Sequence, residues 1–144
     1  MLSKASLQFV NRQYTKCLDT TTEILRLDPF QIAALPNHLC CLYELKEKNK
    51  LFLLAHNLAD SQPEQPTTWF SVGVYYLCVG KIAEARRYFS KSSMMDPHFG
   101  PAWIGFAHSF AAEGEHEQAI SAYTTAARLF QGYDRPPQIR WDLY

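Results

Sequence analysis

Two stretches of the chain decide its fold. Residues 66–97 read PTTWFSVGVYYLCVGKIAEARRYFSKSSMMDP, and residues 100–131 read GPAWIGFAHSFAAEGEHEQAISAYTTAARLFQ. The interval between Trp69 and Trp103 is the same as the interval between Gly80 and Gly114. It recurs among further like residues: Ala85 and Ala119, Phe89 and Tyr123, and the prolines Pro29, Pro63 and Pro97. The chain is therefore built from an internal repeat.

This interval of about 34 residues is the length of a tetratricopeptide repeat, a unit of two antiparallel helices A and B. We predict an all-α, right-handed superhelical solenoid of about four such repeats. An array over residues 1–132 is expected to divide into 1–29, 30–63, 64–97 and 98–131. Residues 133–144 contain Pro136-Pro137 and break the pattern. They are a divergent stub of a further repeat, an alternative terminus or a loose tail, and the stub is favoured because no polar cap is visible.

The matched positions have physical roles in such a unit. Gly73 and Ala107 are small, so helix B can lie close to helix A. Gly80 and Gly114 supply backbone freedom at the turn between the two helices. In the second repeat, where the sequence is more degenerate, we expect helix A over residues 34–46 and helix B over 50–61. In the first repeat, helix A is expected over residues 3–11.

Composition narrows the function classes. The 144 residues carry 14 Lys+Arg and 14 Asp+Glu, so the formal net charge is zero and no nucleic-acid partner is indicated. No apolar run approaches the ~20 residues of a membrane span, and the first residues lack the apolar core of a secretory signal. We expect neither a membrane association nor a signal peptide. Aromatic residues make up 14%, which favours a packing or binding module over a small enzyme.

Catalytic and metal-binding patterns do not appear in the sequence. There is no HExxH, no GxSxG, no P-loop and no Cys–His spacing typical of a zinc site. The four cysteines form no CxxC pair, and buried reduced thiols are expected. Cys78 and His108 could be read as a thiol–imidazole pair, but packing is the ordinary role of their aligned positions. We therefore predict a chain that is not an enzyme and needs no cofactor or metal.

Basic residues cluster on the predicted helix B of the third repeat, at Arg86, Arg87 and Lys91, and Lys46, Lys48 and Lys50 surround an earlier turn. Without stacking aromatics between them or a net positive charge, a solvated face is the expected role. The alternative is a docking face for a short acidic segment of a partner.

Helix A residues line the inner groove of a repeat superhelix. Positions two before, one after and five after the tryptophan are expected to point inward: Thr67, Phe70 and Val74, continued by Leu77; Pro101, Ile104 and His108; and Ala33, Pro36 and Cys40, continued by Tyr43. The candidates for partner binding are Tyr43, Phe70, Val74, Leu77, Ile104 and His108. This groove is apolar and nearly uncharged, which suits a hydrophobic helix or extended segment or self-association. Repeat co-chaperones that hold a C-terminal carboxylate place Lys, Arg and Asn there, so such a clamp is disfavoured.

Three strings carry a more specific resemblance. They are WFSVGVYYL at residues 69–77, EARRYFSK at 84–91 and GPAWIGFAHSF at 100–110. These strings resemble the central repeats of the cell division cycle protein 16 family, the sixth subunit of the anaphase-promoting complex (cyclosome). The similarity extends over residues 3–132 and is strongest over 66–132. The family's chains are several times longer, and the tail with Pro136-Pro137 does not match the repeat that would follow.

The resemblance implies a non-catalytic scaffold of a large nuclear and cytoplasmic ubiquitin ligase. In that family copies pair as homodimers and hold a small accessory subunit and neighbouring repeat subunits, while other subunits transfer ubiquitin. Two further functions stay open: a peptide-binding adaptor or co-chaperone module, and a regulatory repeat domain whose catalytic part lies outside this chain.

Overall fold

The computed structural model describes residues 4–5, 7, 11, 13–27 and 34–130. Seven helices of this part have defined bounds: α2 Tyr14–Leu27, α3 Leu35–Glu44, α4 Lys48–Ser61, α5 Pro66–Cys78, α6 Ile82–Met95, α7 Gly100–Ala112 and α8 His116–Phe130. The described residues contain no strand. The predicted all-α tetratricopeptide-repeat fold is confirmed.

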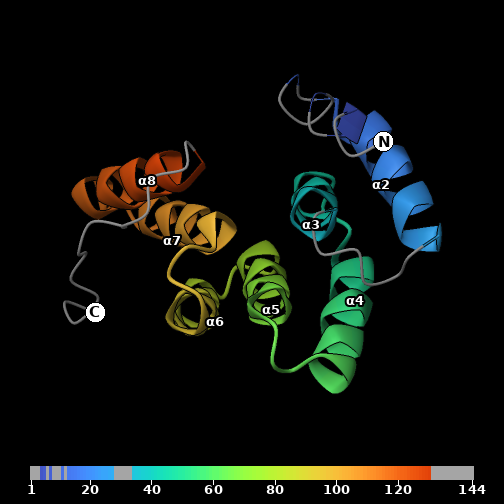
Figure 1. Ribbon diagram of the computed structural model, residues 1–144. Coiled ribbons are helices and arrows are strands. Elements are labelled where there is room, and N and C mark those ends of the chain that lie inside the picture. Colours follow the sequence, from blue (N-terminus) through green and yellow to red (C-terminus); the bar gives the residue numbers. More distant parts are fainter. Residues whose placement is uncertain (1–3, 6, 8–10, 12, 28–33, 131–144) are drawn as a thin grey trace.

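Short turns join α3 to α4, α5 to α6 and α7 to α8, at residues 45–47, 79–81 and 113–115. Such short connections place consecutive helices antiparallel and side by side. Figure 1 shows α3, α5 and α7 along the inner side of a curve, with α4 and α6 on its outside. The second repeat's helices begin and end close to the expected bounds. Helix A of the first repeat, and the tail over 133–144, lie largely or wholly outside the described residues.

The repeated tryptophans and prolines are linked by hydrogen bonds. Trp69 Nε1 donates to the carbonyl of Pro63 at 2.8 Å, and Trp103 Nε1 donates to the carbonyl of Pro97 at 2.9 Å. Each bond ties the first turns of a helix A to the loop that precedes it. The proline at this position of the repeat thus has a second role, because its carbonyl accepts this bond. The repeat spacing thus preserves a pair of residues that contact each other.

The turns within the helix pairs require a left-handed backbone. Gly80 has φ +85° and Gly114 has φ +78°, which fits the predicted need for glycine at this position. Lys46 occupies the aligned position one repeat before Gly80, and it adopts φ +58° without being a glycine. The second repeat therefore makes the same turn with a residue that is strained there.

The core runs between the helix pairs and is rich in aromatic rings. Phe89, Phe106 and Phe110 are among the largest fully buried side chains. A Cβ on Gly73 would stand 2.6 Å from Cε1 of Phe89, so the ring of helix B lies directly against the backbone of helix A. This contact is the close approach for which the sequence predicted a small residue at position 73.

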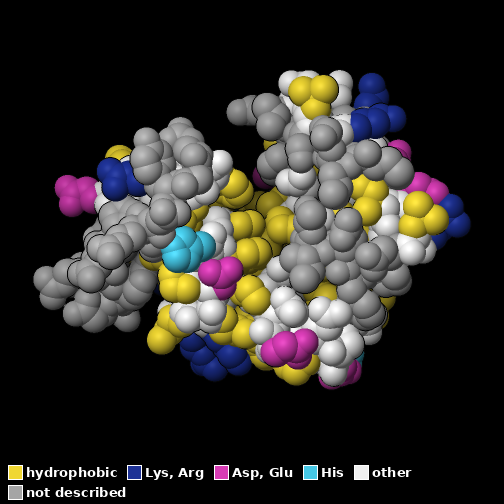
Figure 2. All heavy atoms as spheres, viewed as in Figure 1, with side chains coloured by type: hydrophobic (Ala, Val, Ile, Leu, Met, Phe, Trp, Pro, Cys, Tyr) yellow, Lys and Arg dark blue, Asp and Glu magenta, His cyan; other side chains and the backbone are white. Residues whose placement is uncertain are grey.

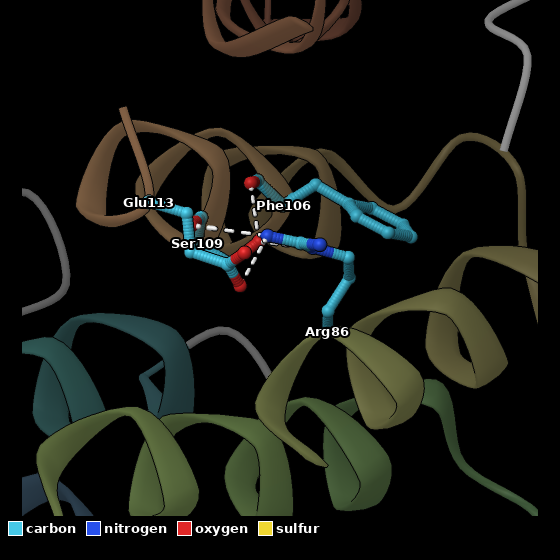
Figure 3. Close-up of polar contacts among 4 residues, drawn as sticks. All are labelled: Arg86, Phe106, Ser109 and Glu113. Atoms are coloured by element: carbon cyan, nitrogen blue, oxygen red, sulfur yellow. Dashed lines mark hydrogen bonds and ion pairs between the residues drawn. The ribbon is translucent and has the colours of Figure 1, made fainter. Parts of the chain in front are cut away.

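One basic residue departs from the expected solvated face. The side chain of Arg86, on α6, is only 13% exposed and crosses to α7 (Figure 3). Its Nη2 donates to Glu113 Oε1 at 2.8 Å and to the carbonyl of Ser109 at 3.3 Å, and its guanidinium lies 4.4 Å from the centre of the Phe110 ring. The prediction was wrong for Arg86, because a long side chain at this position reaches the next repeat. The side chain of Arg87, in contrast, is 72% exposed.

A second, smaller buried cluster lies between α2 and α3, on the N-terminal side of the main core. Cys17 and Cys41 are fully buried there together with Ala5, and the Cys17 thiol donates to the carbonyl of Ala5 at 3.2 Å. All four cysteines have free thiols. Within the described part of the chain, no helix combines the length and the apolar character that crossing a bilayer would demand.

Candidate functional site

The six candidate residues lie together on one groove. Its volume is about 570 Å³, and α3, α5 and α7 supply most of its lining. The candidates follow one helical stripe, because the positions one, five and eight after the tryptophan lie on a single face of helix A. Figure 2 shows hydrophobic side chains gathered in the hollow between these helices. Their role in binding a partner stays a prediction. The lining candidates are Tyr43, Phe70, Val74, Leu77, Ile104 and His108.

The candidates divide into a floor and two walls. Phe70, Val74 and Leu77 of α5 are 2%, 5% and 8% exposed, so they form a packed floor. Phe70 rests on Phe89 and Phe99, with both ring centres 5.8 Å away. Tyr43 of α3 and Ile104 and His108 of α7 are more accessible and form the walls. A partner would touch the wall side chains most, whereas the floor also supports the core.

The groove has further lining residues besides the six candidates, some of them expected and some not. The expected inward positions Pro36, Cys40 and Pro101 line it, while Ala33 lies outside the described residues. Thr67 does not line it. Its side chain is buried, and its Oγ1 has no hydrogen-bond partner among the described residues. The additional lining residues are Asn37, Glu44, Phe89, Gly105 and Phe130.

Asn37, Glu44 and Gly105 could have been found, because they occupy the same helix A face as the predicted stripe. Phe89 and Phe130 come from B helices, and Phe130 ends α8 with 63% of its surface exposed. Nothing in the spacing of helix A points to side chains that arrive from a B helix. Their presence makes the groove more aromatic than the predicted stripe alone.

Polar groups of the groove interact with one another and with the neighbouring helix α8. Nδ1 of His108 and the hydroxyl of Tyr123 are 2.9 Å apart. Loss of hydration lowers the pKa of His108, and the charge of Glu44 acts against that effect. Burial raises the pKa of Tyr43, and the charge of Glu44 raises it further. At neutral pH His108 is therefore uncharged, and Tyr43 keeps its proton.

The groove holds no reactive thiol. Burial raises the pKa of Cys40 to about 12, so its thiolate is scarce at neutral pH. His108 hydrogen-bonds Tyr123 and makes no hydrogen bond to Cys78. No group of three His, Cys, Asp or Glu side chains in the described ranges is arranged to hold a metal ion. What the geometry offers chemically is an apolar surface with a few polar groups at its edges.

Several known proteins are similar to this chain over most of its length. The chain is 62% identical over 136 residues to the anaphase-promoting complex subunit cut9 of Schizosaccharomyces pombe, which covers 94% of this chain and 20% of that protein. It is 47% identical over 134 residues to the anaphase-promoting complex subunit CDC16 of Saccharomyces cerevisiae, covering 93% of this chain and 16% of that one. The cell division cycle protein 16 homolog of Homo sapiens is 44% identical over 94% of this chain and 22% of its own length.

The repeats belong to the cell division cycle protein 16 family. No protein-family profile matches the chain. The chain spans about a fifth of the length of these curated relatives of the cell division cycle protein 16 family.

Solved structures agree with this assignment. A chain in the crystal structure of the APC/C hetero-tetramer Cut9–Hcn1 matches with a TM-score of 0.86 and 64% identity, over 90% of this chain and 25% of that one. The Thermus thermophilus tetratricopeptide-repeat protein TTC0263 matches with a TM-score of 0.66 at 16% identity, over 90% of this chain and 73% of that one. The second match shows the shared repeat fold alone. The first match is similar to this chain in both fold and sequence, in agreement with the cell division cycle protein 16 family.

Proposed function

We propose that this chain is a non-catalytic scaffold of an anaphase-promoting complex, a ubiquitin ligase that drives cell-cycle progression. The observation that carries the proposal is the 62% identity to cut9 over 94% of the chain. The repeats supply surfaces that hold other proteins, and the described part offers no catalytic constellation. Ubiquitin transfer is assigned to other subunits of such a complex. The proposed locations are the nucleus and the cytoplasm, where this ligase would act.

The groove is the proposed contact surface. Its apolar floor and its walls of Tyr43, Ile104 and His108 suit a hydrophobic helix or an extended segment. The proposed occupants are segments of other subunits of the complex, including a small accessory subunit, or of a second copy of this chain. One related structure is a hetero-tetramer of Cut9 and Hcn1, which supports assembly with other subunits and in more than one copy.

A co-chaperone function is disfavoured by the charges in the groove. A clamp for a terminal carboxylate needs Lys or Arg side chains that donate to its oxygens. The described lining residues include neither Lys nor Arg. Asn37 is the one residue among them of a type that such clamps use. Glu44 would repel a carboxylate entering the groove. The alternative adaptor function therefore lacks the chemistry that would recognise its ligand.

The proposal is tested by affinity capture with mass spectrometry. The 144-residue chain is immobilised and exposed to an extract of dividing fission yeast, whose cut9 is the relative with 62% identity. Recovery of anaphase-promoting complex subunits above a bead control is expected. Recovery of heat-shock proteins alone would contradict the proposal and favour the co-chaperone function.

A further inference from the structure

We propose that the segment held in the groove carries a cationic group, a lysine, an arginine or a free amine, that pairs with Glu44. This inference rests on the proposed function, since it needs the groove to be a docking surface. It adds a chemical requirement that the apolar lining alone does not impose. Glu44 is thereby a specificity-determining residue.

Glu44 is the one Asp, Glu, Lys or Arg side chain among the described lining residues of the groove. Eleven of the fourteen lining residues are apolar or are Cys, Tyr or Gly, and the other three are Asn37, Glu44 and His108. His108 is uncharged because partial loss of hydration lowers its pKa. The described lining therefore presents a single negative charge on an apolar background.

The backbone reinforces this charge. Glu44 is the last residue of α3, where unpaired carbonyl groups give the helix end a partial negative charge. No basic residue stands in the last turn of α3 to offset it. The charge of Glu44 acts on Tyr43 of its own helix and on His108 of α7, so its field extends across the groove between the two walls.

Glu44 has no counter-ion among the described residues, and it is solvent-exposed. The nearby ammonium of Lys46 lies 4.8 Å from the centre of the Tyr43 ring, and no ion pair joins it to Glu44. Water therefore hydrates the exposed face of this carboxylate. An apolar segment that covers the groove removes part of that water, and burying an unpaired carboxylate is strongly unfavourable. A cation on the segment removes this penalty and supplies charge-assisted hydrogen bonds.

The test is a selection from a display library of random dodecapeptides. The library is panned separately against the wild-type chain, Glu44→Gln and Glu44→Lys. Glu64→Gln is the matched control, because Glu64 is exposed and does not line the groove. Circular dichroism of each variant confirms an unchanged helix content before the selection.

On the wild type and on Glu64→Gln we expect apolar peptides with a Lys or Arg at a fixed distance from the apolar residues. On Glu44→Gln this preference disappears, and on Glu44→Lys it changes to Asp or Glu. A peptide selected on the wild type should bind Glu44→Gln about tenfold more weakly. Apolar peptides without a basic residue, or a basic preference that survives in Glu44→Gln, would overturn the inference but leave the docking groove standing. A wild-type chain that selects no apolar peptides contradicts both the docking groove and the inference.

Discussion

The ring of Phe89 occupies the space in which a side chain of Gly105 would begin. A Cβ on Gly105 would stand 2.5 Å from Cε1 of Phe89, and one on Gly73 would stand 2.6 Å from the same atom. Phe89 of α6 is fully buried between the backbones of α5 and α7. The ring therefore joins the third predicted repeat to the fourth and sets the distance between the two A helices that carry the groove.

Gly105→Ala is expected to destabilise the chain. Alanine favours a helix by about 1 kcal/mol over glycine, but overpacking a buried aromatic ring costs about 1–3 kcal/mol. Because Phe89 is fully buried against the backbones of both A helices, we expect a net loss of roughly 1–2 kcal/mol, seen as a lower urea midpoint. The control is the same substitution in a Phe89→Leu background, where the smaller side chain should relieve most of the loss. Equal losses in both backgrounds would contradict the contact.

Arg86→Ala is expected to destabilise the chain by about 2–3 kcal/mol, because it removes the hydrogen bonds to the carbonyl of Ser109 and to Glu113 and the contact with the Phe110 ring. Arg86→Lys should recover only part of this loss, since an ammonium cannot contact Ser109, Glu113 and the Phe110 ring together. Unfolding in urea measures both variants.

The matched control for Arg86 is Arg87→Ala, on the same helix. The side chain of Arg87 is 72% exposed. Its removal should leave the free energy of unfolding within about 0.5 kcal/mol of the wild type. Similar losses for Arg86→Ala and Arg87→Ala would count against the bridge between α6 and α7.

Lys46→Gly is expected to stabilise the chain. Lys46 holds φ +58°. This conformation costs a residue with a Cβ about 1–2 kcal/mol. Glycine removes this strain but gains freedom in the unfolded chain and loses the contact with the Tyr43 ring, so a net gain of about 0.5–1 kcal/mol is expected. Gly80→Lys, at the aligned position, should have the opposite sign. A lower thermal midpoint for Lys46→Gly would show that the backbone there is not strained.

Acid is expected to weaken the packing of α2 against α3 through His38. Burial, and then the charge of Lys50, lower the pKa of His38 to about 4, and its Nδ1 lies 2.9 Å from the hydroxyl of Thr21. The unfolded chain binds a proton near pH 6.5, so it holds more protons than the folded chain between about pH 6.5 and 4. Stability present above about pH 6.5 is lost as the pH falls through this window, by about 3 kcal/mol at most.

Urea unfolding at pH 7 and pH 5 measures this effect. In His38→Gln, which keeps a polar group for Thr21 but does not titrate, the difference between the two pH values should shrink. A remainder is expected from His108, whose pKa is also lowered. An identical pH dependence in wild type and variant would exclude His38 as the source.

The sequence predicted the repeat, the helix bounds and the groove stripe because these depend on spacing alone. Gly73 and the two turn glycines could be assigned because each recurs or has a small counterpart. The close packing of Gly105 against Phe89 could not be predicted, since serine stands at the aligned position 71 and gives no sign of close packing. The contacts of Arg86 with the next repeat could not be predicted either, because composition does not show how far a long side chain reaches. Lys46 was missed because a left-handed turn leaves no signal when glycine is absent.

The groove between α3, α5 and α7 has the main role proposed for this chain, that of holding a partner. The direct test measures the amount of anaphase-promoting complex subunits captured by the wild-type chain, by Ile104→Asp and by Ile120→Asp. Ile104 lies on a groove wall, whereas Ile120 is 65% exposed on α8 and does not line the groove. We predict that Ile104→Asp lowers capture about tenfold or more and that Ile120→Asp leaves it within about twofold. Full capture by Ile104→Asp, with wild-type helix content, would contradict this role of the groove.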